Sequence, residues 1–218
     1  MLERTETGDG SHSLLHTVLQ EHYHSQHGAL QESQHVFLNM GLTCIQSPEI
    51  HVLEFGFGTG LNTLLTQDFA EKTKQVIHYH GLEKYPIKSD IWRDLNYGTL
   101  LGRSKEFENI HQASWEQWSK LSDNFYLHKN QIGFEDFQPK ENHYDIIYFD
   151  AFAPRYHPEA WQEVNLKVCY RALKPGGIWV TYCAQGAVRR QLIEVGFQVE
   201  RLQGPPGKRE MLRATKPK

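Results

Sequence analysis

The sequence predicts an α/β protein built on an open, mostly parallel sheet flanked by helices. From residue 50 onward, short apolar runs with strand character alternate with longer runs of helical character. A glycine-rich segment, 56–60, lies directly between the first of these strands and the first helix. Open α/β sheets bind ligands beyond the carboxyl ends of their strands, so this segment marks the expected binding edge.

The alternation continues through most of the chain. The predicted strands are residues 50–55, 76–82, 125–128, 144–150, 178–183, 197–201 and 209–214. The predicted helices lie near residues 61–71, 88–101, 114–121, 158–173 and 186–195. Pro175-Gly176-Gly177 is predicted to end the fourth helix and turn the chain into the next strand. We expect residues 102–122 to form helical decoration between the second and third strands.

Length and composition indicate one globular domain over residues 1–218, with 39% hydrophobic and 22% charged residues. Its core is predicted at 50–216, preceded by an N-terminal extension at 1–40. Within the extension, residues 1–12 are expected to be frayed, and 13–40 to form a short helix followed by an extended loop.

The chain shows no apolar run of membrane-spanning length and no secretion signal. Its three cysteines, Cys44, Cys169 and Cys183, are far apart and show no metal or redox spacing. We therefore expect reduced thiols and a cytoplasmic protein.

Charge is unevenly distributed along the chain. Residues 1–166 hold 12 Lys/Arg against 23 Asp/Glu, whereas residues 167–218 hold 11 Lys/Arg against 3 Asp/Glu. A basic C-terminal quarter on an acidic body predicts a polyanion-binding face, although a merely solvated surface explains the counts about as well.

The glycine-rich turn predicts a cofactor site. Glu54 lies in the first strand, two positions before Gly56, and Gly58 and Gly60 follow at alternate positions before the helix. Glycine permits positive φ and a close approach of ligand to backbone, and a helix N-terminus offers free N–H groups. Glu83, about twenty residues after the last glycine, ends the second strand, where an acid accepts hydrogen bonds from ribose hydroxyls.

Asp150 is the predicted catalytic residue. It ends the apolar run Tyr144–Asp150, and Pro154 soon after it prevents an immediate helix. A carboxylate there faces the same crevice as the glycine turn. An alkyl amine is mostly protonated near pH 7, and a carboxylate in contact with it can orient the ammonium group and take its proton. A helix N-cap or an ion pair is the alternative role for Asp150.

Four blocks carry a family resemblance: LEFGFGTGLN at 53–62, YFDAFAPRYHPEAW at 148–161, LKPGGIWVTYCAQGAVRR at 173–190 and GFQVERLQGPPGKREMLRA at 196–214. A weaker block is YHSQHGALQESQHVF at 23–37. With these blocks the chain resembles the tRNA 5-aminomethyl-2-thiouridine methyltransferases over roughly residues 20–216. The DAFAP and GPPGKREM blocks are specific, whereas the glycine turn is shared with nicotinamide and flavin proteins.

The resemblance implies a Rossmann-like class I methyltransferase fold, with a seven-stranded sheet whose last strand is antiparallel. It implies transfer of a methyl group from S-adenosylmethionine to the amine of 5-aminomethyl-(2-thio)uridine at the tRNA wobble position, with S-adenosylhomocysteine as the product. The turn resembles methyltransferase motif I, so the expected cofactor residues are Glu54, Gly56, Gly58, Gly60, Asn62, Glu83 and Asp150. In the family the aspartate lies against the acceptor amine, which agrees with the role argued for Asp150.

The implied partner is the anticodon region of tRNA. We expect Tyr23, Phe152 and Tyr182 to stack on a splayed base, with Ser25 beside them, although packing is the commoner role of such aromatics. The residues expected to contact phosphates are Arg189, Arg190, Lys208 and Arg209. The chain ends soon after the KREM block, so no fused flavin oxidase domain is expected.

Other readings stay open. Adenine is contacted either by backbone or by Gln131, because no acid follows the third strand directly. The histidine pairs His12/His16 and His22/His24 lack partners at ligand spacing, so no metal is predicted. The alternative activities are a small-amine methyltransferase, an aminopropyltransferase of similar fold, and a nucleoside-binding RNA chaperone that would not need Asp150.

Overall fold

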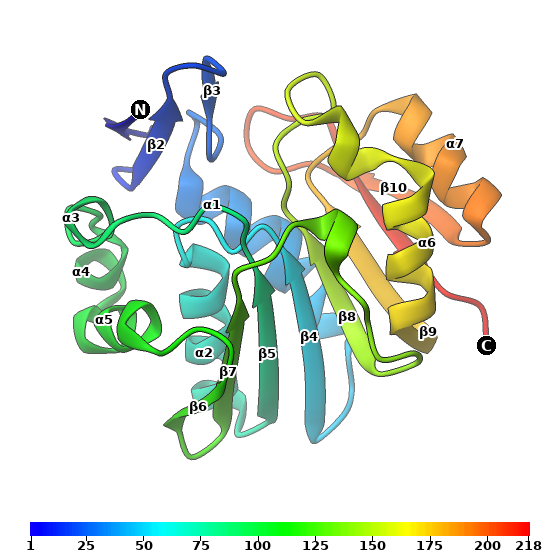
Figure 1. The fold of residues 1–218 in the computed structure, drawn as a ribbon, viewed down its shortest axis with the longest axis horizontal. Coiled ribbons are helices and arrows are strands. Elements are labelled where there is room, and N and C mark those ends of the chain that lie inside the picture. Colours follow the sequence, from blue (N-terminus) through cyan, green and yellow to red (C-terminus); the bar gives the residue numbers. More distant parts are fainter.

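The computed structural model describes residues 1–218, which form a large sheet flanked by helices and a small N-terminal sheet (Figure 1). The large sheet has the strand order β10-β11-β9-β8-β4-β5-β7-β6. Its strands are β4 (Glu49–Phe55), β5 (Val76–Leu82), β6 (Trp118–Ser122), β7 (Phe125–Asn130), β8 (Tyr144–Phe149), β9 (Leu173–Thr181), β10 (Gln198–Gln203) and β11 (Glu210–Thr215). The predicted α/β class is confirmed.

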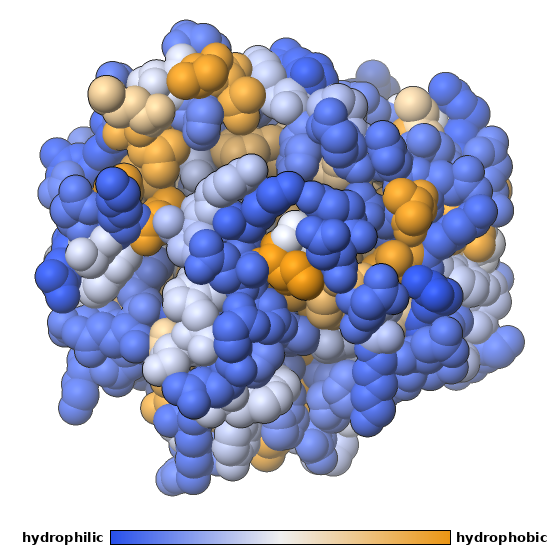
Figure 2. Space-filling model, viewed as in Figure 1, coloured by the Kyte–Doolittle hydropathy of each residue, from blue (hydrophilic) through white to orange (hydrophobic).

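The five central strands run parallel, because β4 pairs in parallel with β5 and β8, β5 with β7, and β8 with β9. The last strand, β11, is antiparallel to both β9 and β10, as expected. The sheet has eight strands instead of seven because β6 adds an antiparallel edge to β7. None of the helices combines the length and apolar character needed to cross a bilayer. Figure 2 shows this face of the molecule as mostly hydrophilic, with small separate apolar patches.

The helical segments lie between these strands. They are α1 (Ala29–Ser33), the π-helix η1 (Gln34–Asn39), η2 (Leu42–Cys44), α2 (Leu61–Thr73), α3 (Ser89–Trp92), α4 (Tyr97–Leu101), α5 (Ser104–Gln112), η3 (Phe134–Asp136), η4 (Pro158–Trp161), α6 (Glu163–Ala172) and α7 (Gly186–Val195). The predicted helices at 88–101 and 158–173 are therefore each divided in two.

Two predictions about local structure are wrong. The segment 114–121 is not helical: the helix is α5, and residues from Trp118 form the edge strand β6, whose Trp118 ring packs on His78 and His128. Pro175-Gly176-Gly177 does not separate helix from strand. Instead β9 already begins at Leu173, and Gly176, at φ +80°, lies inside an irregular part of that strand.

The N-terminal extension is also more ordered than predicted. It forms a three-stranded antiparallel sheet of β1 (Leu2–Glu6), β2 (His12–His16) and β3 (Glu21–His22), where a frayed end and a helix were expected. The turn before β2 is held by Asp9, whose carboxylate accepts hydrogen bonds from Ser11 N and Gln31 N. Because Asp9 binds the start of α1, the small sheet is fixed to the main body.

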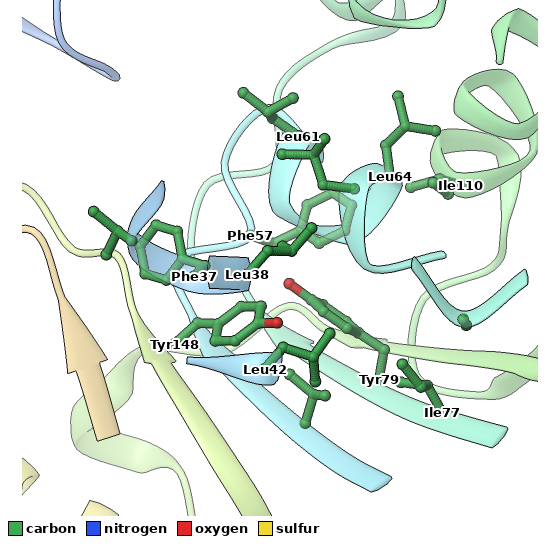
Figure 3. Close-up of a cluster of buried hydrophobic side chains, with 14 of the residues drawn as sticks. Phe37, Leu38, Leu42, Phe57, Leu61, Leu64, Ile77, Tyr79, Ile110 and Tyr148 are labelled. Carbon is green, nitrogen blue, oxygen red and sulfur yellow. The ribbon is translucent and has the colours of Figure 1, made fainter. Parts of the chain in front are cut away.

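Two apolar cores cover the faces of the large sheet. On one face α2, η1 and α5 pack on residues such as Val52, Tyr79 and Tyr148. Figure 3 shows the hydroxyl groups of Tyr79 and Tyr148 pointing toward one another in this core. On the other face α6 and α7 pack on Phe149 and Trp179. The carboxyl ends of β4, β5 and β8 open between these layers, below the N-terminal sheet (Figure 1).

Candidate active site

A cavity of about 670 Å³ lies at the carboxyl ends of the parallel strands. This volume is within the ordinary range for small-molecule sites. One part of its wall comes from loops after the strands: Gly56, Phe57, Gly58, Thr59, Glu83, Lys84, Tyr85, Gly133, Phe134, Glu135, Asp150, Ala151 and Phe152. Another part comes from the N-terminal extension: Leu2, His16, Leu19, Tyr23 and His24. The extension therefore closes a site that the core alone would leave open.

The glycine turn has the geometry that its sequence predicts. Gly56, Gly58 and Gly60 have φ values of +93°, +50° and +74°. A Cβ on Gly56 would lie 2.5 Å from the carbonyl oxygen of Asp150, so the turn packs directly on the loop after β8. Gly56 and Gly58 line the cavity, whereas Gly60 lies behind it at the start of α2.

Two acidic side chains share one amide group in the cavity wall. Asn62 Nδ2 donates hydrogen bonds to Glu54 Oε1 at 2.9 Å and to Asp150 Oδ2 at 2.8 Å. Glu54 is only 1% exposed, and its burial, together with the nearby Asp150, raises the pKa of its carboxyl well above the usual range. Glu54 Oε2 and Asn62 Oδ1 are buried and have no hydrogen-bond partner in the chain. Of the three residues only Asn62 and Asp150 line the cavity, so these two can meet a cationic ligand, whereas Glu54 lies behind Asn62.

Asp150 has a pKa raised to about 7. Burial is the largest cause, and the negative charge of Glu32 adds to it, while the Asn62 hydrogen bond and the positive charge of Lys208 act in the opposite direction. A carboxylate with a pKa near the working pH is suited to take and release a proton. Backbone N–H of Asp150 donates to Phe55 O at 2.9 Å, which fixes the residue at the end of the sheet.

Glu83 lies across the glycine turn from this pair. Its Oε2 accepts a hydrogen bond from Gly58 N at 3.0 Å, and its Oε1 accepts one from Tyr85 N at 2.8 Å. Burial raises the pKa of its carboxyl. Each carboxylate oxygen has a second lone pair, so Glu83 keeps the capacity to accept from ligand hydroxyls.

The aromatic residues predicted for the substrate side line the cavity together. Tyr23 and Phe152 are in edge contact, with ring centroids 5.0 Å apart. Tyr182 donates a hydrogen bond to Ala151 O at 2.9 Å, and the ammonium group of Lys208 lies 4.0 Å from its ring centroid.

Five other predicted substrate residues do not line the cavity: Ser25, Arg189, Arg190, Lys208 and Arg209. Ser25 instead shapes the N-terminal loop, because its backbone N donates to Glu32 Oε1 at 2.8 Å. Lys208 is not part of a free basic surface. It forms an ion pair with the buried Glu32, and this carboxylate balances its charge. Arg190 and Arg209 are exposed.

Several wall residues were not predicted. Gln131, one candidate for contacting adenine, does not line the cavity. The residues that line this part of the wall are Gly133, Phe134 and Glu135. His16 and His24 come from the extension, and burial lowers the pKa of His24 to about 4. The sequence singled out both histidines only as members of the pairs His12/His16 and His22/His24, and His24 also lies in the YHSQHGAL block.

A sequence model of the family described as "S-adenosyl-L-methionine-dependent methyltransferase" matches residues 105–217, more than half of the chain. The chain belongs to this family. S-adenosylmethionine is accordingly the cofactor of this methyltransferase, and the acceptors of Asn62 and Asp150 in the cavity wall suit the cationic end of such a molecule.

Among curated relatives, the methyltransferase is similar to proteins named "tRNA 5-methylaminomethyl-2-thiouridine biosynthesis bifunctional protein MnmC". The protein of Delftia acidovorans is 30% identical over 210 residues, which cover 89% of this chain and 32% of the relative. The protein of Paracidovorax citrulli is 31% identical over 210 residues, with the same coverage. The chain thus spans about a third of the length of these relatives.

Solved structures share the fold. The structure of MNMC2 from Aquifex aeolicus matches with a TM-score of 0.76 at 24% identity, covering 100% of this chain and 72% of the other. A putative methyltransferase solved in complex with the Trm112 activator of Haloferax volcanii matches with a TM-score of 0.52 at 13% identity, covering 86% and 90%. The expected Rossmann-like methyltransferase fold is confirmed.

Proposed function

We propose that this methyltransferase transfers a methyl group to the amine of a 5-aminomethyl group on the wobble uridine of tRNA. The observation that carries the proposal is Asp150, a half-buried carboxylate with a pKa raised to about 7 in the wall of the cofactor cavity. The names of the curated relatives support the tRNA substrate, because they describe biosynthesis of 5-methylaminomethyl-2-thiouridine. We place the reaction in the cytoplasm, where tRNA is available.

The cofactor residues are assigned as follows. Asn62 lines the cavity and accepts from the ammonium group of the methionine part through Oδ1, which has no partner in the chain, and Glu54 holds the Asn62 amide from behind. Gly56 and Gly58 let the cofactor approach the backbone, and Glu83 accepts from the ribose hydroxyls. Backbone at Gly133 and the ring of Phe134 lie where adenine is expected. When bound, S-adenosylmethionine supplies an electrophilic methyl group on a positively charged sulfur.

Asp150 is the proposed catalytic base. An acceptor amine arrives mostly as an ammonium ion and has no lone pair for attack until it loses a proton. Asp150 Oδ2 is held by Asn62, and the carboxylate orients the ammonium group and accepts its proton. The carboxyl pKa of about 7 keeps a large fraction of Asp150 ionised at neutral pH while leaving it basic enough to take that proton.

The acceptor base is proposed to bind between the N-terminal extension and the loop after β8. Tyr23 and Phe152 offer aromatic surfaces in the cavity wall. His16 adds a directional contact. Its Nδ1 accepts a hydrogen bond from Leu19 N at 3.1 Å, so in the neutral ring the proton is on Nε2. His16 is therefore proposed to donate from Nε2 to a pyrimidine oxygen or sulfur.

The phosphate contacts are assigned to exposed arginines. Arg190 and Arg209 remain candidates on the C-terminal part of the sheet, as the sequence indicates. Arg155 is a further candidate, because its guanidinium lies over the ring of Tyr156 in the cavity wall. Its side chain is 68% exposed and makes one long contact, 3.4 Å to Glu21 Oε2. Such contacts set affinity and register rather than base identity.

A small amine is the second candidate acceptor. The structure brings a second acid, Glu54, close to Asp150 through Asn62, and Glu32 also acts on the pKa of Asp150. An acidic cluster of this kind also suits a free diamine. The aromatic rings of Tyr23 and Phe152 in the cavity wall favour a nucleoside instead.

One experiment tests the proposal and separates the two acceptors. The protein is incubated with S-adenosylmethionine and either tRNA carrying 5-aminomethyluridine or free diamines, and the products are analysed by mass. The proposal expects a nucleoside heavier by one methylene and no modified diamine. A modified diamine with unchanged tRNA would replace the tRNA assignment by the small-amine activity.

A further inference from the structure

The sheet carries a histidine cluster at the end opposite to the cavity. His51 on β4 and His78 on β5 are register partners, and Tyr126 on β7 is the partner of His78 on the other side. The chain between β7 and β8 contains only the short turn η3, so no helix covers this part of the face. Figure 1 shows α6 in front of the β9 side, whereas the amino ends of β4, β5 and β7 are uncovered.

Three ligand-type side chains converge in this uncovered region. Glu49, His51 and His78 each offer one nitrogen or oxygen atom, and these atoms all lie within 4.8 Å of one another. Glu49 Oε1 lies 3.0 Å from His78 Nε2. The rings of His51 and His78 are stacked, with centroids 4.9 Å apart. Glu49 and His51 are two residues apart on β4 and therefore share one face of the sheet.

We propose that Glu49, His51 and His78 form a binding site for a divalent transition-metal ion, with zinc as the best match. Two imidazoles and one carboxylate are a common zinc ligand set, and water completes a tetrahedron. Tetrahedral ligands at 2.0–2.1 Å from zinc are about 3.4 Å apart. The ligand atoms therefore need to move closer together by roughly 1.5 Å or less to bind an ion, which side-chain rotation can provide.

A carboxylate lies beside the proposed ligand His51. Asp145 Oδ2 accepts a hydrogen bond from the backbone N of His51 at 2.8 Å and lies 3.6 Å from His51 Nδ1. Lys174 Nζ binds both carboxylate oxygens of Asp145, at 2.7 and 2.8 Å. Metal-bound imidazoles are commonly oriented by a carboxylate of this kind. The side chains of Glu49, His51 and His78 are 58%, 21% and 26% exposed, so an ion has access from solvent.

The predicted effect of the ion is structural. It would link β4 to β5 at the amino ends of these strands, whereas Asp150 and the cavity lie at the carboxyl ends. This link would strengthen an edge of the core that lacks a covering helix. The sequence gives no sign of the site, because His51 and His78 are on different strands and show no ligand spacing along the chain.

Zinc titration of the full-length protein tests the site. The protein is stripped with chelator, ZnCl2 is added during isothermal titration calorimetry, and thermal unfolding is followed with and without the ion. We expect one zinc per chain and a higher unfolding temperature with zinc. His51→Gln, His78→Gln and Glu49→Gln should each weaken binding at least tenfold, whereas the control His22→Gln on the N-terminal sheet should bind as the wild type does.

Two results would overturn the site. One is a wild-type protein that neither binds zinc nor gains thermal stability from it, which would leave only the Glu49–His78 ion pair. The other is unchanged zinc affinity in the three ligand variants, which would place the ion elsewhere. Circular dichroism checks that each variant folds. If a histidine variant does not fold, Glu49→Gln provides the test, because Glu49 is the most exposed of the three ligands.

Discussion

The Asp150 carboxylate accepts a hydrogen bond from Asn62 Nδ2 at 2.8 Å. Because Asn62 belongs to the helix that follows the glycine turn, this bond connects the predicted cofactor loop to the proposed catalytic base. Asp150→Asn keeps the shape and an acceptor oxygen for Asn62 but loses basicity. We expect kcat to fall about 10²–10⁴-fold, the range of general base catalysis, while cofactor affinity stays within about tenfold. Equilibrium binding of the cofactor and single-turnover kinetics measure the two effects.

The pH dependence of activity should reflect the charges around Asp150. Its carboxyl must be ionised to act as a base, so kcat/KM should rise with pH through about 7 in the wild type. Lys208→Met removes a positive charge and should move the profile to higher pH. Glu32→Gln removes a negative charge and should move it to lower pH. Shifts in the same direction for both variants would contradict this electrostatic account.

The same carboxyl should reduce the stability of the fold above neutral pH. The pKa of Asp150 is raised from 3.8 to about 7, so the ionised form is penalised in the folded protein as pH rises through this window. Asp150→Asn should therefore stabilise the fold at pH 8 by on the order of 1–4 kcal/mol, and by much less at pH 4. Urea unfolding at the two pH values measures the difference, and equal effects at both would argue against a raised pKa.

Gly56 should tolerate no side chain. Gly56→Ala would bring Cβ within 2.5 Å of Asp150 O at a φ of +93°, so both backbone strain and a clash arise. We expect a loss of about 2–4 kcal/mol in unfolding free energy and no measurable cofactor binding. Gly102→Ala is the matched control. Gly102 has a φ of +66° but no atom within 4 Å of the added Cβ, so it should cost only about 1 kcal/mol and leave cofactor binding intact.

His16 should affect the acceptor and not the cofactor. His16→Phe keeps an aromatic ring against Phe152 but removes the Nε2 donor. We expect KM for tRNA to rise about tenfold, as for one lost hydrogen bond to a ligand, with cofactor affinity unchanged. His22→Gln is the control. An unchanged KM in His16→Phe would remove His16 from the proposed base contacts.

Local patterns in the sequence predict the central fold well. The strand at 76–82 and the helix at 186–195 coincide with β5 and α7, because apolar periodicity acts locally and, for the helix, Gly186 and Gly196 mark its ends. The glycine turn and Asp150 were likewise predicted from strand ends. The predicted ends of these strands are therefore sufficient to locate the cavity at the carboxyl edge of the sheet.

Long-range pairing explains what was missed. The strand β1 reads LERTE, without alternation, and exists because it pairs with β2. Lys208 and Glu32 are 176 positions apart, so counting basic residues could not reveal that Lys208 is paired with the buried Glu32. The extension contributes His16 and Tyr23 to the cavity because it folds back onto the core, which local sequence patterns do not predict.

The most direct measurement is the position of the methyl group on tRNA. A tRNA carrying 5-aminomethyluridine is incubated with the enzyme and isotope-labelled S-adenosylmethionine, and the nucleosides are analysed by tandem mass spectrometry. The account predicts label on the side-chain nitrogen of the wobble uridine with the wild type, and its loss with Asp150→Asn. Label on a ring atom or ribose, or no label on tRNA, would contradict it.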